Sequence, residues 1–503
     1  MRYKTDICHT FSRNDMKRFW IVFVIGMILL SGISCRDEDY ITDPEAGLSF
    51  STDTISFDTI FTSIGSTTKQ LKIYNPHKQA IRISQIYLGQ GDNSYFRLNI
   101  DGNVTDHAND IEIPSKDSLF IFIEVTIDPF GVNNPMVIND SIVFVANGNV
   151  QDVNLIAYGQ DVHLIDGELI ESQTWIADKP YLIYHSMGVD SARTLTIEAG
   201  VKLFFHEGSQ LIVLGSLIAN GTKENPVIFR GDRLDEVLPD LSYDKIPDQW
   251  GGIVIYPYSR GNRLNYCHIR NAEIGIFLPG VIGYDYQSEI EIRNSIIENN
   301  SFAGIYAFNA SVTAFNCLIV NCGTYTFAGI TGGEYNLYHC TISNHYRFSG
   351  SPEPAVILTN FVYLDYNDSL ISHDLRNTKF INCIIEGQSP YQLQLASKPE
   401  NIFNFKFENC LIEVSKDSID ADSTELFKDI VFEEDPKFKK IPTQSDPLPD
   451  RYIFDFSLDT LSPAKDAGTT EIINLFPELE FDIIGNSRLA DSGPDLGAYE
   501  RIE

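Results

Sequence analysis

A short motif recurs six times in the second half of the chain and restricts the fold more than any other feature. The copies read NYCHIRN, RNSIIEN, FNCLIVN, YHCTISN, INCIIEG and ENCLIEV. Their shared cysteine or serine lies at intervals of 28, 22, 23, 43 and 27 residues, at Cys267, Ser295, Cys317, Cys340, Cys383 and Cys410. Repeats of about 20 to 50 residues are typical of solenoids, whose units stack and share one core. The motif therefore predicts a solenoid of short strands, with an insertion in the 43-residue interval.

The motif also predicts which side chains face the core. Residues two apart in a strand share a face, so the cysteine or serine and the isoleucine two positions later are expected to point inward. In four copies an asparagine follows two positions further on, at Asn271, Asn299, Asn321 and Asn344. The chain must bend there, and asparagine side chains can satisfy turn backbone without any ligand.

The cysteines of this ladder raise the alternatives of a metal site and a disulfide. Zinc sites need closely spaced, convergent ligands, whereas these thiols come one per coil, so no metal site is predicted. Cys317 and Cys322 are five residues apart, but only Cys317 belongs to the repeat. Adjacent parallel strands lie about 4.8 Å apart, close enough for a disulfide, although parallel side-chain directions and burial favour free thiols.

Residues 163–430 resemble a known solenoid family. The segment LTIEAGVKLFFHEGSQLIVLGSLIANGTKENPVIFRGD strings short alternating strands between turn residues, and WGGIVI resembles the next coil. With the ladder, these segments resemble the right-handed parallel β-helices of the pectate-lyase-like superfamily. The superfamily includes lyases, polygalacturonases and epimerases, so the resemblance implies the fold and leaves catalysis open.

Residues 431–503 carry a second resemblance. DPKF, LSPAKDAG and DIIGNSRLADSGPDLGAYE resemble, in this order, the closing signature of many secreted bacterial β-helix proteins. A solenoid's last coil exposes its apolar interior and an unpaired strand edge unless something covers them. We therefore expect this segment to cap the last coil, with its charged residues paired to one another.

Residues 48–162 show the period-two alternation of half-buried strands. KQLKIYNP places Leu71 and Ile73 on one face, and SLFIFIEVTIDP does the same with Leu119, Ile121 and Ile123. Turn residues interrupt the pattern at hairpin intervals, which predicts a β-sandwich. The segment resembles immunoglobulin-like modules of bacterial surface proteins, which act as spacers or binding units. The expected fold class is thus all-β, an Ig-like sandwich followed by a parallel β-helix and a cap.

The N-terminus predicts export. Lys17 and Arg18 precede FWIVFVIGMILLSGIS, an apolar run too short to span a membrane, so residues 1–34 are predicted to be a signal peptide, with Met16 as the true start. LLSGISCRDEDY resembles a bacterial lipoprotein signal, which implies that Cys35 is acylated. The acidic linker 35–47 begins like an export tag to the outer face of the outer membrane. A plain secretory peptide with an incidental cysteine is the alternative.

The chain is strongly acidic. It carries 37 Lys and Arg against 69 Asp and Glu, a formal net charge of −32. This charge argues against nucleic acid or an anionic lipid surface as a partner. It suits solubility at the cell exterior or, alternatively, carboxylate clusters that bind Ca²⁺; no other cofactor is predicted.

A long insertion, GDRLDEVLPDLSYDKIPDQW, offers the richest set of candidate ligand-binding residues. They are Asp235, Glu236, Asp240, Tyr243, Asp244 and Trp250. Long loops in compact repeats are often functional, and the two aromatic residues suit stacking on a sugar. No Ca²⁺-loop spacing is present, so solvated cover is the competing interpretation. Aromatic insertions TYTFAGI, NHYRFSGSPEP and NFVYLDYND suggest a groove for a glycan or a protein.

The sequence predicts no catalytic residue. A hydrolase needs convergent carboxylates on one outer face, whereas the outward position after the ladder residue is mostly apolar. Glu298, Glu386 and Glu413 are outward but lie on separate coils. The predicted function is therefore noncatalytic recognition of a glycan or another surface component by an outer-membrane lipoprotein. The alternatives are a polysaccharide lyase or glycoside hydrolase, and a structural stalk.

Overall fold

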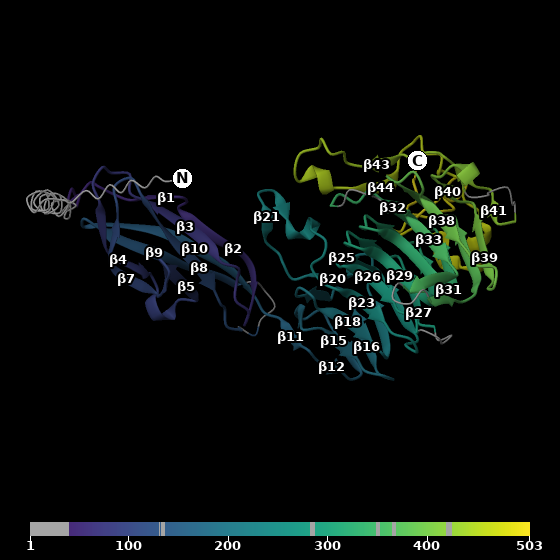
Figure 1. Cartoon of the computed structure of the whole chain (residues 1–503), viewed down its shortest axis with the longest axis horizontal. Helices are drawn as coiled ribbons and strands as arrows, with labels where there is room; N and C mark the ends of the chain where they lie inside the picture. The colour runs from purple at the N-terminus through teal and green to yellow at the C-terminus, as the bar shows by residue number, and fades with distance from the viewer. Residues whose placement is uncertain are drawn as a thin grey trace, which may run out of the picture. The chain divides into compact units, whose positions relative to one another are not determined.

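The computed structural model describes residues 40–129, 131, 136–281, 287–348, 353–364, 369–418 and 425–502 (Figure 1). The predicted signal peptide, Met16 and Cys35 lie outside these residues. No helix within them is long and apolar enough to cross a membrane. The chain forms two compact units: one contains Gly65–Thr126, Ile138–Ala157 and the described chain before Asp58, and the other contains Asp58–Ile64, Ile127–Val137 and the chain from Tyr158 onward.

The first unit is built from two five-stranded sheets. One sheet has the order β1 (Ser49–Phe50), β3 (Lys69–Tyr74), β8 (Ser118–Val125), β5 (Phe96–Ile100) and β6 (Asn103–Val104). The other has the order β2 (Thr54–Phe61), β10 (Asn149–Gln160), β9 (Met136–Ala146), β4 (Ile81–Leu88) and β7 (His107–Ile113), and a short 3₁₀ turn η1 spans Gly91–Asn93. Leu71 lies opposite Ile121 and Ile73 opposite Leu119, and all four are buried, as the alternation predicts. The relation to immunoglobulin-like modules stays a prediction.

The second unit is a parallel β-helix whose coils contribute to three faces (Figure 1). Face 1 consists of β12 (Leu169–Ile170), β15 (Met187–Val189), β18 (Gln210–Val213), β23 (Gly252–Ile255), β26 (Ile274–Leu278), the first halves of β29 (Ala303–Phe315) and β31 (Tyr325–Tyr338), β33 (Val356–Thr359) and β38 (Leu393–Ala396). Face 2 consists of β13 (Gln173–Trp175), β16 (Thr194–Glu198), β19 (Ser216–Asn220), β24 (Asn262–Asn265), β27 (Glu289–Arg293), the second halves of β29 and β31, β36 (Leu375–Ile381), β39 (Phe403–Glu408) and β41 (Phe427–Lys428).

Face 3 follows the ladder residues. It consists of β11 (His163–Asp166), β14 (Tyr181–Tyr184), β17 (Lys202–Phe205), β20 (Val227–Gly231), β25 (Cys267–Arg270), β28 (Ile296–Glu298), β30 (Leu318–Val320), β32 (Thr341–Asn344), β37 (Ile384–Gly387), β40 (Leu411–Ile412) and β42 (Val431–Phe432). Inward side chains of all three faces form one continuous apolar core. The predicted all-β class with a parallel solenoid is confirmed.

Two insertions leave the coils. The loop predicted at 231–250 forms the hairpin β21 (Glu236–Leu238) and β22 (Leu241–Ser242) and the turn η2 (Tyr243–Lys245). The 43-residue interval contains the antiparallel hairpin β34 (Phe361–Leu364) and β35 (Ser369–Ser372), between faces 1 and 2. A further 3₁₀ turn, η3, spans Lys416–Ser418.

The C-terminal segment lies along the outside of face 3, so its predicted place over the last coil is wrong (Figure 1). Its elements are β43 (Phe438–Lys440), η4 (Asp450–Tyr452), β44 (Asp455–Leu458), α2 (Glu471–Leu475) and η5 (Pro477–Glu480). Leu318, Ile384 and Leu411 point outward from face 3 and are buried beneath it. Burial of these outward apolar side chains is the physical reason for lateral packing.

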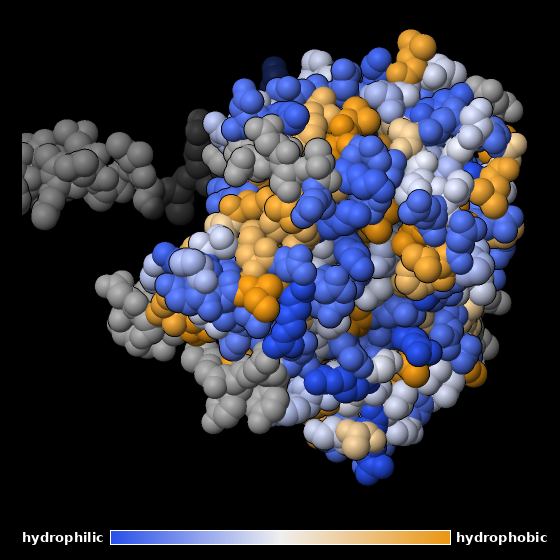
Figure 2. Space-filling model, turned by 90° about the vertical axis from the view of Figure 1, so that its right-hand side faces the viewer, coloured by the Kyte–Doolittle hydropathy of each residue, from blue (hydrophilic) through white to orange (hydrophobic). Residues whose placement is uncertain are grey.

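The outer surface is otherwise mostly polar. Figure 2 shows one side of the molecule, on which hydrophilic residues surround several separate apolar patches. Scattered apolar side chains are normal on soluble proteins. Aromatic or charged side chains that gather on one face are therefore the features that distinguish a candidate site from the rest of this surface.

Candidate functional site

The insertion 231–250 does not assemble the predicted ligand site. Asp244 forms ion pairs at 2.6 Å with both Arg230 and Arg270, and Asp235 pairs at 2.6 Å with Arg233. Burial lowers the pKa of Arg230 to about 10, with the charge of Arg270 adding to the effect. These arginines occupy the carboxylate oxygens that a Ca²⁺ ion would need. Within the described chain, no group of three or more His, Cys, Asp or Glu is arranged to hold a metal ion.

The other residues predicted in this insertion also lie apart. Glu236 and Asp240 are exposed on the β21–β22 hairpin. The guanidinium of Arg233 lies 3.9 Å from the centre of the Tyr243 ring and covers one of its faces. Trp250 is only 2% exposed, because it stacks on Phe205 in the core at 4.1 Å. The expectation that Trp250 stacks on a sugar is therefore wrong.

The ladder cysteines lie inside the solenoid. Cys267, Cys317, Cys340, Cys383 and Cys410 are buried free thiols, and so is Cys322. Each ladder thiol lies near the carbonyl oxygen two residues before it, as in the 3.3 Å contact from Cys317 Sγ to the oxygen of Phe315. Burial raises the pKa of the Cys267 thiol, which keeps it protonated and unreactive.

The predicted corner asparagines do adopt strained backbone, and a second set was missed. Asn271, Asn299 and Asn321 have φ of 64°, 54° and 56°, in the left-handed region that asparagine tolerates better than most residues. Asn344 instead accepts a hydrogen bond from the Cys322 amide through Oδ1 at 3.2 Å. The residue directly before each ladder position is also left-handed, at Tyr266, Asn294, Asn316, His339, Asn382 and Asn409. The recurring Asn–Cys pair was the signal for this second corner.

A charged strip runs along face 3, where Arg270, Glu298, Val320, Ser343 and Glu386 are in register. His268 Nε2 lies 2.7 Å from Glu298, and His345 Nε2 lies 3.1 Å from Glu386. Ser343 donates a hydrogen bond to Glu386 as well.

The electrostatics of this strip follow from its pairing. Burial opposes ionisation of Glu298, but the charges of His268, Arg270 and Lys245 outweigh it and lower the pKa to about 2. Burial raises the pKa of Glu413, which lies near Glu386. The two carboxylates of Glu298 and Glu386 are thus both engaged by histidines on their own face.

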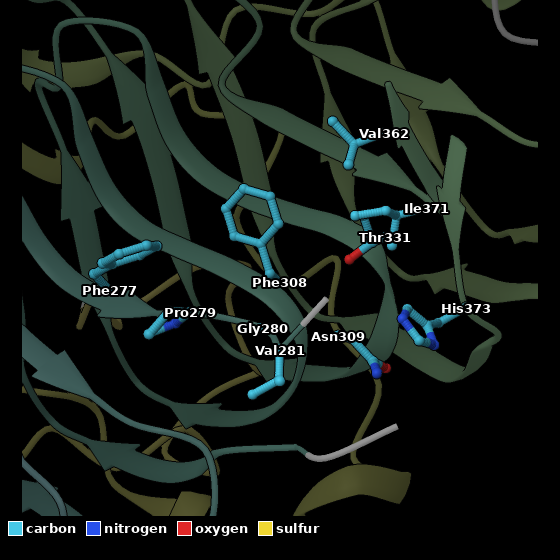
Figure 3. A pocket seen from close by; sticks show the side chains of 10 residues that line it. All are labelled: Phe277, Pro279, Gly280, Val281, Phe308, Asn309, Thr331, Val362, Ile371 and His373. Carbon is cyan, nitrogen blue, oxygen red and sulfur yellow. The ribbon is translucent and has the colours of Figure 1, made fainter. Parts of the chain in front are cut away.

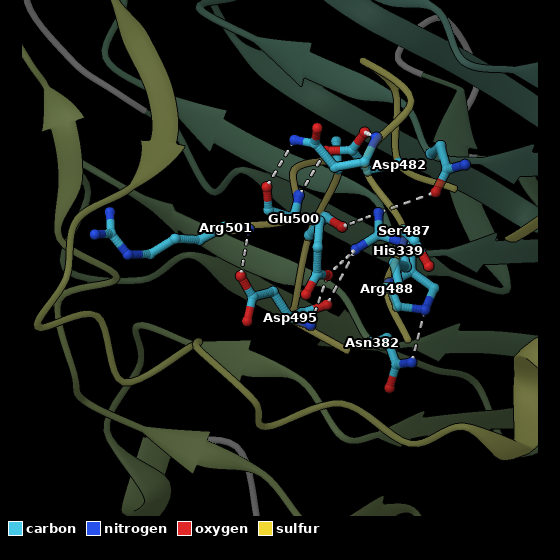
Figure 4. A network of polar contacts seen from close by, with 12 residues as sticks. His339, Asn382, Asp482, Ser487, Arg488, Asp495, Glu500 and Arg501 are labelled. Atoms are coloured by element: carbon cyan, nitrogen blue, oxygen red, sulfur yellow. Dashed lines mark hydrogen bonds and ion pairs between the residues drawn. The ribbon is translucent and has the colours of Figure 1, made fainter. Parts of the chain in front are cut away.

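The C-terminal signature residues form a buried network (Figure 4). Arg488 is fully buried; its Nη1 lies 3.2 Å from Glu500 Oε2, and its Nη2 donates to Asn316 Oδ1 at 3.1 Å. Asp482 accepts the Glu500 amide at 2.7 Å, and Asp495 accepts the Arg501 amide at 2.7 Å. Burial raises the pKa of Glu500 to about 8, with Arg488 opposing it. Of these contacts, the bond from Arg488 to Asn316 joins the segment to the solenoid, and the others stabilise the segment itself.

Aromatic side chains gather on the outer side of face 1. Phe277 on β26 and Tyr306 on β29 are in register and stack with centroids 5.9 Å apart, and Tyr325 on β31 lies parallel to Tyr306 at 6.4 Å. Phe302 and Phe308 meet Tyr306 edge to face at 5.2 and 4.9 Å. We call these five rings the aromatic cluster. All five are partly exposed.

Of the three aromatic insertions predicted to make a groove, the first and the third lie side by side, and the second lies apart. Tyr325, from the first, belongs to the aromatic cluster. Tyr346 and Phe348, from the second, pack together at 5.6 Å, and Phe348 also stacks on Tyr452 of the C-terminal segment. The third insertion forms the β34–β35 hairpin, which stands beside the aromatic cluster.

A pocket of about 210 Å³ lies between the aromatic cluster and this hairpin (Figure 3). Phe277 and Phe308 line one side, and Val362 and Ile371 of the hairpin line the other. Of the aromatic insertions that suggested a groove, NFVYLDYND supplies Val362 to this pocket, whereas Phe277, Phe308 and Ile371 lie outside those insertions.

Comparison with known families supports the fold. Residues 196–342 and 279–432 match the family described as right handed beta helix region. The solenoid is a right-handed parallel β-helix. No curated protein matches the chain.

Solved structures resemble it only weakly. A PapD-like domain of human CEP192 is 11% identical, with 26% of this chain and 94% of that chain covered, at a TM-score of 0.17. The catalytic domain of a GH87 α-1,3-glucanase is 12% identical, with 68% and 81% covered, at 0.17. XylC in complex with xylose is 9% identical, with 89% of each chain covered, at 0.23. Such scores carry no argument about function.

Proposed function

We propose that this protein recognises a glycan at the cell exterior without cleaving it, and that the aromatic cluster is the binding surface. The observation that carries the proposal is the grouping of five partly exposed rings around Tyr306, beside an apolar pocket. A sugar ring has an apolar face of C–H groups, and aromatic surfaces bury such faces from water.

The charge distribution favours binding over catalysis. Glycoside hydrolysis requires two carboxyl groups that flank the scissile bond. No aspartate or glutamate is among the described residues that line the pocket. On face 3, Glu298 and Glu386 are each engaged by a histidine.

A glycan array with the purified protein, followed by analysis of every bound polysaccharide for shortened or unsaturated products, tests this proposal. We expect binding without turnover, and Tyr306→Ala or Tyr325→Ala should weaken it at least about tenfold, as loss of an aromatic anchor does. Tyr87→Ala removes a 37% exposed ring from β4 of the first unit and is the matched control. Appearance of products would make the protein an enzyme; an empty array would favour a protein partner or a structural role.

We propose further that the protein is held at the outer membrane by acyl chains on Cys35. The support is the sequence alone, in the apolar run, the cysteine and the acidic residues that follow it. Two or three acyl chains suffice for stable attachment. Cys35→Ala should move the protein from the membrane fraction to the soluble fraction and abolish incorporation of labelled palmitate; retention of both would exclude the anchor.

A further inference from the structure

The pocket beside the aromatic cluster is too small for a whole oligosaccharide. Its volume is about 210 Å³, whereas pockets for complete small ligands span about 300 to 1,000 Å³. The pocket adjoins the aromatic cluster, because Phe277 and Phe308 belong to both. A sugar lying on the cluster would therefore place one substituent, and not its whole ring, in the pocket.

The lining of the pocket disfavours a polar substituent. Phe277, Phe308, Val362 and Ile371 supply its walls (Figure 3). The Thr331 hydroxyl is used, because it donates to the carbonyl oxygen of Ile330 at 2.7 Å.

The remaining polar groups of the pocket are engaged as well. Asn309 Oδ1 accepts a hydrogen bond from Gln287 at 3.1 Å, and Asn309 and His373 have further partners within the protein. A sugar hydroxyl placed here would give up its hydrogen bonds to water without full replacement, which costs free energy.

The charges of the pocket and of the whole chain further restrict the class of sugar that can bind. No lysine, arginine, aspartate or glutamate is among the described residues that line the pocket, and the chain has a net charge of −32. An anionic sugar such as a uronate would meet a repulsive field and no cation in the pocket.

We infer that this pocket selects a neutral glycan by a methyl group, carried either at C6 of a 6-deoxy sugar or by an acetyl substituent. The inference rests on the proposed glycan recognition and names the class of glycan. A methyl group gains from burial among Phe308, Val362 and Ile371, whereas a hydroxymethyl group at the same place would be left without partners.

Matched oligosaccharides that differ in one group test the inference. L-Fucose-terminated chains are compared with L-galactose-terminated chains, and N-acetylglucosamine-terminated with glucose-terminated chains, with a glucuronate-terminated chain as the anionic probe. We expect one methyl-bearing member to bind at least about tenfold more tightly than its partner. In saturation-transfer NMR its methyl protons should receive the strongest saturation.

Substitutions in the β34–β35 hairpin test whether the methyl preference arises in this pocket. Val362→Asn, and separately Ile371→Ser, should reduce the preference to within about twofold, because a polar side chain in the wall removes the apolar contact of the methyl group. Tyr363→Ala is the control on the same strand as Val362, since Tyr363 is 50% exposed, meets Phe361 edge to face and does not line the pocket. Tyr306→Ala should weaken both members of each pair.

Each remaining outcome has a definite meaning. Glycan binding with no methyl preference overturns this inference and leaves the proposed function standing. A preference that survives both Val362→Asn and Ile371→Ser also overturns it, because the methyl group then binds elsewhere. Failure of every glycan to bind overturns the proposed function and the inference together.

Discussion

At the scale of single residues, two backbone corners and one ladder explain the repeated motif. The position before the ladder residue is left-handed, and asparagine fills it in four of the six copies. Ser295 can replace cysteine in the ladder because its hydroxyl donates to the carbonyl oxygen of Arg293 at 2.6 Å. Cys317 makes the equivalent contact with Phe315. The motif therefore reflects two requirements: a left-handed backbone at the corner and a small side chain at the core position.

Glu298 gives a pH-dependent prediction at the same scale. Its folded-state pKa of about 2 lies below the ordinary 4.5, so the folded protein binds fewer protons than the unfolded chain between these values. The stability contributed by Glu298 is complete above about pH 4.5 and is lost as the pH falls toward 2. Because the side chain is 29% exposed, we expect Glu298→Gln to cost about 2 kcal/mol at pH 5.5.

Urea unfolding at pH 5.5 and pH 2.5 measures this difference. Tryptophan fluorescence reports the solenoid, because Trp175 and Trp250 are both in its core. The difference in the free energy of unfolding between wild type and Glu298→Gln should be smaller at the lower pH. Glu207→Gln changes an exposed carboxylate and should have little effect at either pH. An equal gap at both values would contradict the assigned pKa.

At the scale of elements, the C-terminal segment is fastened to the solenoid at the corner before the ladder residues and along face 3. Asn382 Nδ2 donates to the carbonyl oxygen of Thr469 at 2.9 Å, and Thr341 Oγ1 accepts the amide of Ala498 at 2.9 Å. The αL corner residue Asn382 thus serves a second purpose, because its side chain binds both His339 of the neighbouring coil, at 2.8 Å, and the segment. The buried pair of Arg488 and Glu500 lies within the segment, next to these bonds.

Removing one partner of that pair should release the segment. Arg488→Ala removes a fully buried guanidinium together with its contacts to Glu500 and Asn316, and breaking such a buried pair costs about 3 to 5 kcal/mol. We expect limited proteolysis to cut residues 434–503 much faster in this variant than in wild type. The double variant Arg488→Met with Glu500→Gln replaces the whole buried pair by neutral side chains of similar size and should recover most of the protection. Equal cleavage of Arg488→Ala and wild type would show that the network does not hold the segment.

At the scale of the whole molecule, two faces of the β-helix differ in what lies on their outer side. Face 3 is covered by the C-terminal segment, and face 1 presents the aromatic cluster and the pocket. A solenoid exposes each outward position of every coil, so an apolar outward column needs a cover. The segment supplies it, which leaves face 1 as the surface that we propose for recognition.

Truncation tests this division. A chain that ends at Glu433 exposes Leu318, Ile384 and Leu411 on face 3, and we expect it to be largely insoluble or aggregated on size-exclusion chromatography. Replacing these three leucine and isoleucine residues by serine should restore solubility to the truncated chain and destabilise the full-length one. A soluble, monomeric truncated chain without these replacements would show that the cover is dispensable.

The ladder interval and the alternation of apolar residues predict the solenoid, because both are local patterns that each coil repeats. The C-terminal segment and the apolar outward column are both visible in the sequence, but nothing in it shows that one covers the other. Only the tertiary structure joined them, since Leu318 and Ala498 meet across a long stretch of chain. Trp250 and the insertion at 231–250 show the same limit, because composition does not reveal whether a ring faces the core or solvent. The pocket between β26, β29 and the β34–β35 hairpin depends on how an insertion folds back over a neighbouring coil, and no local pattern encodes that contact.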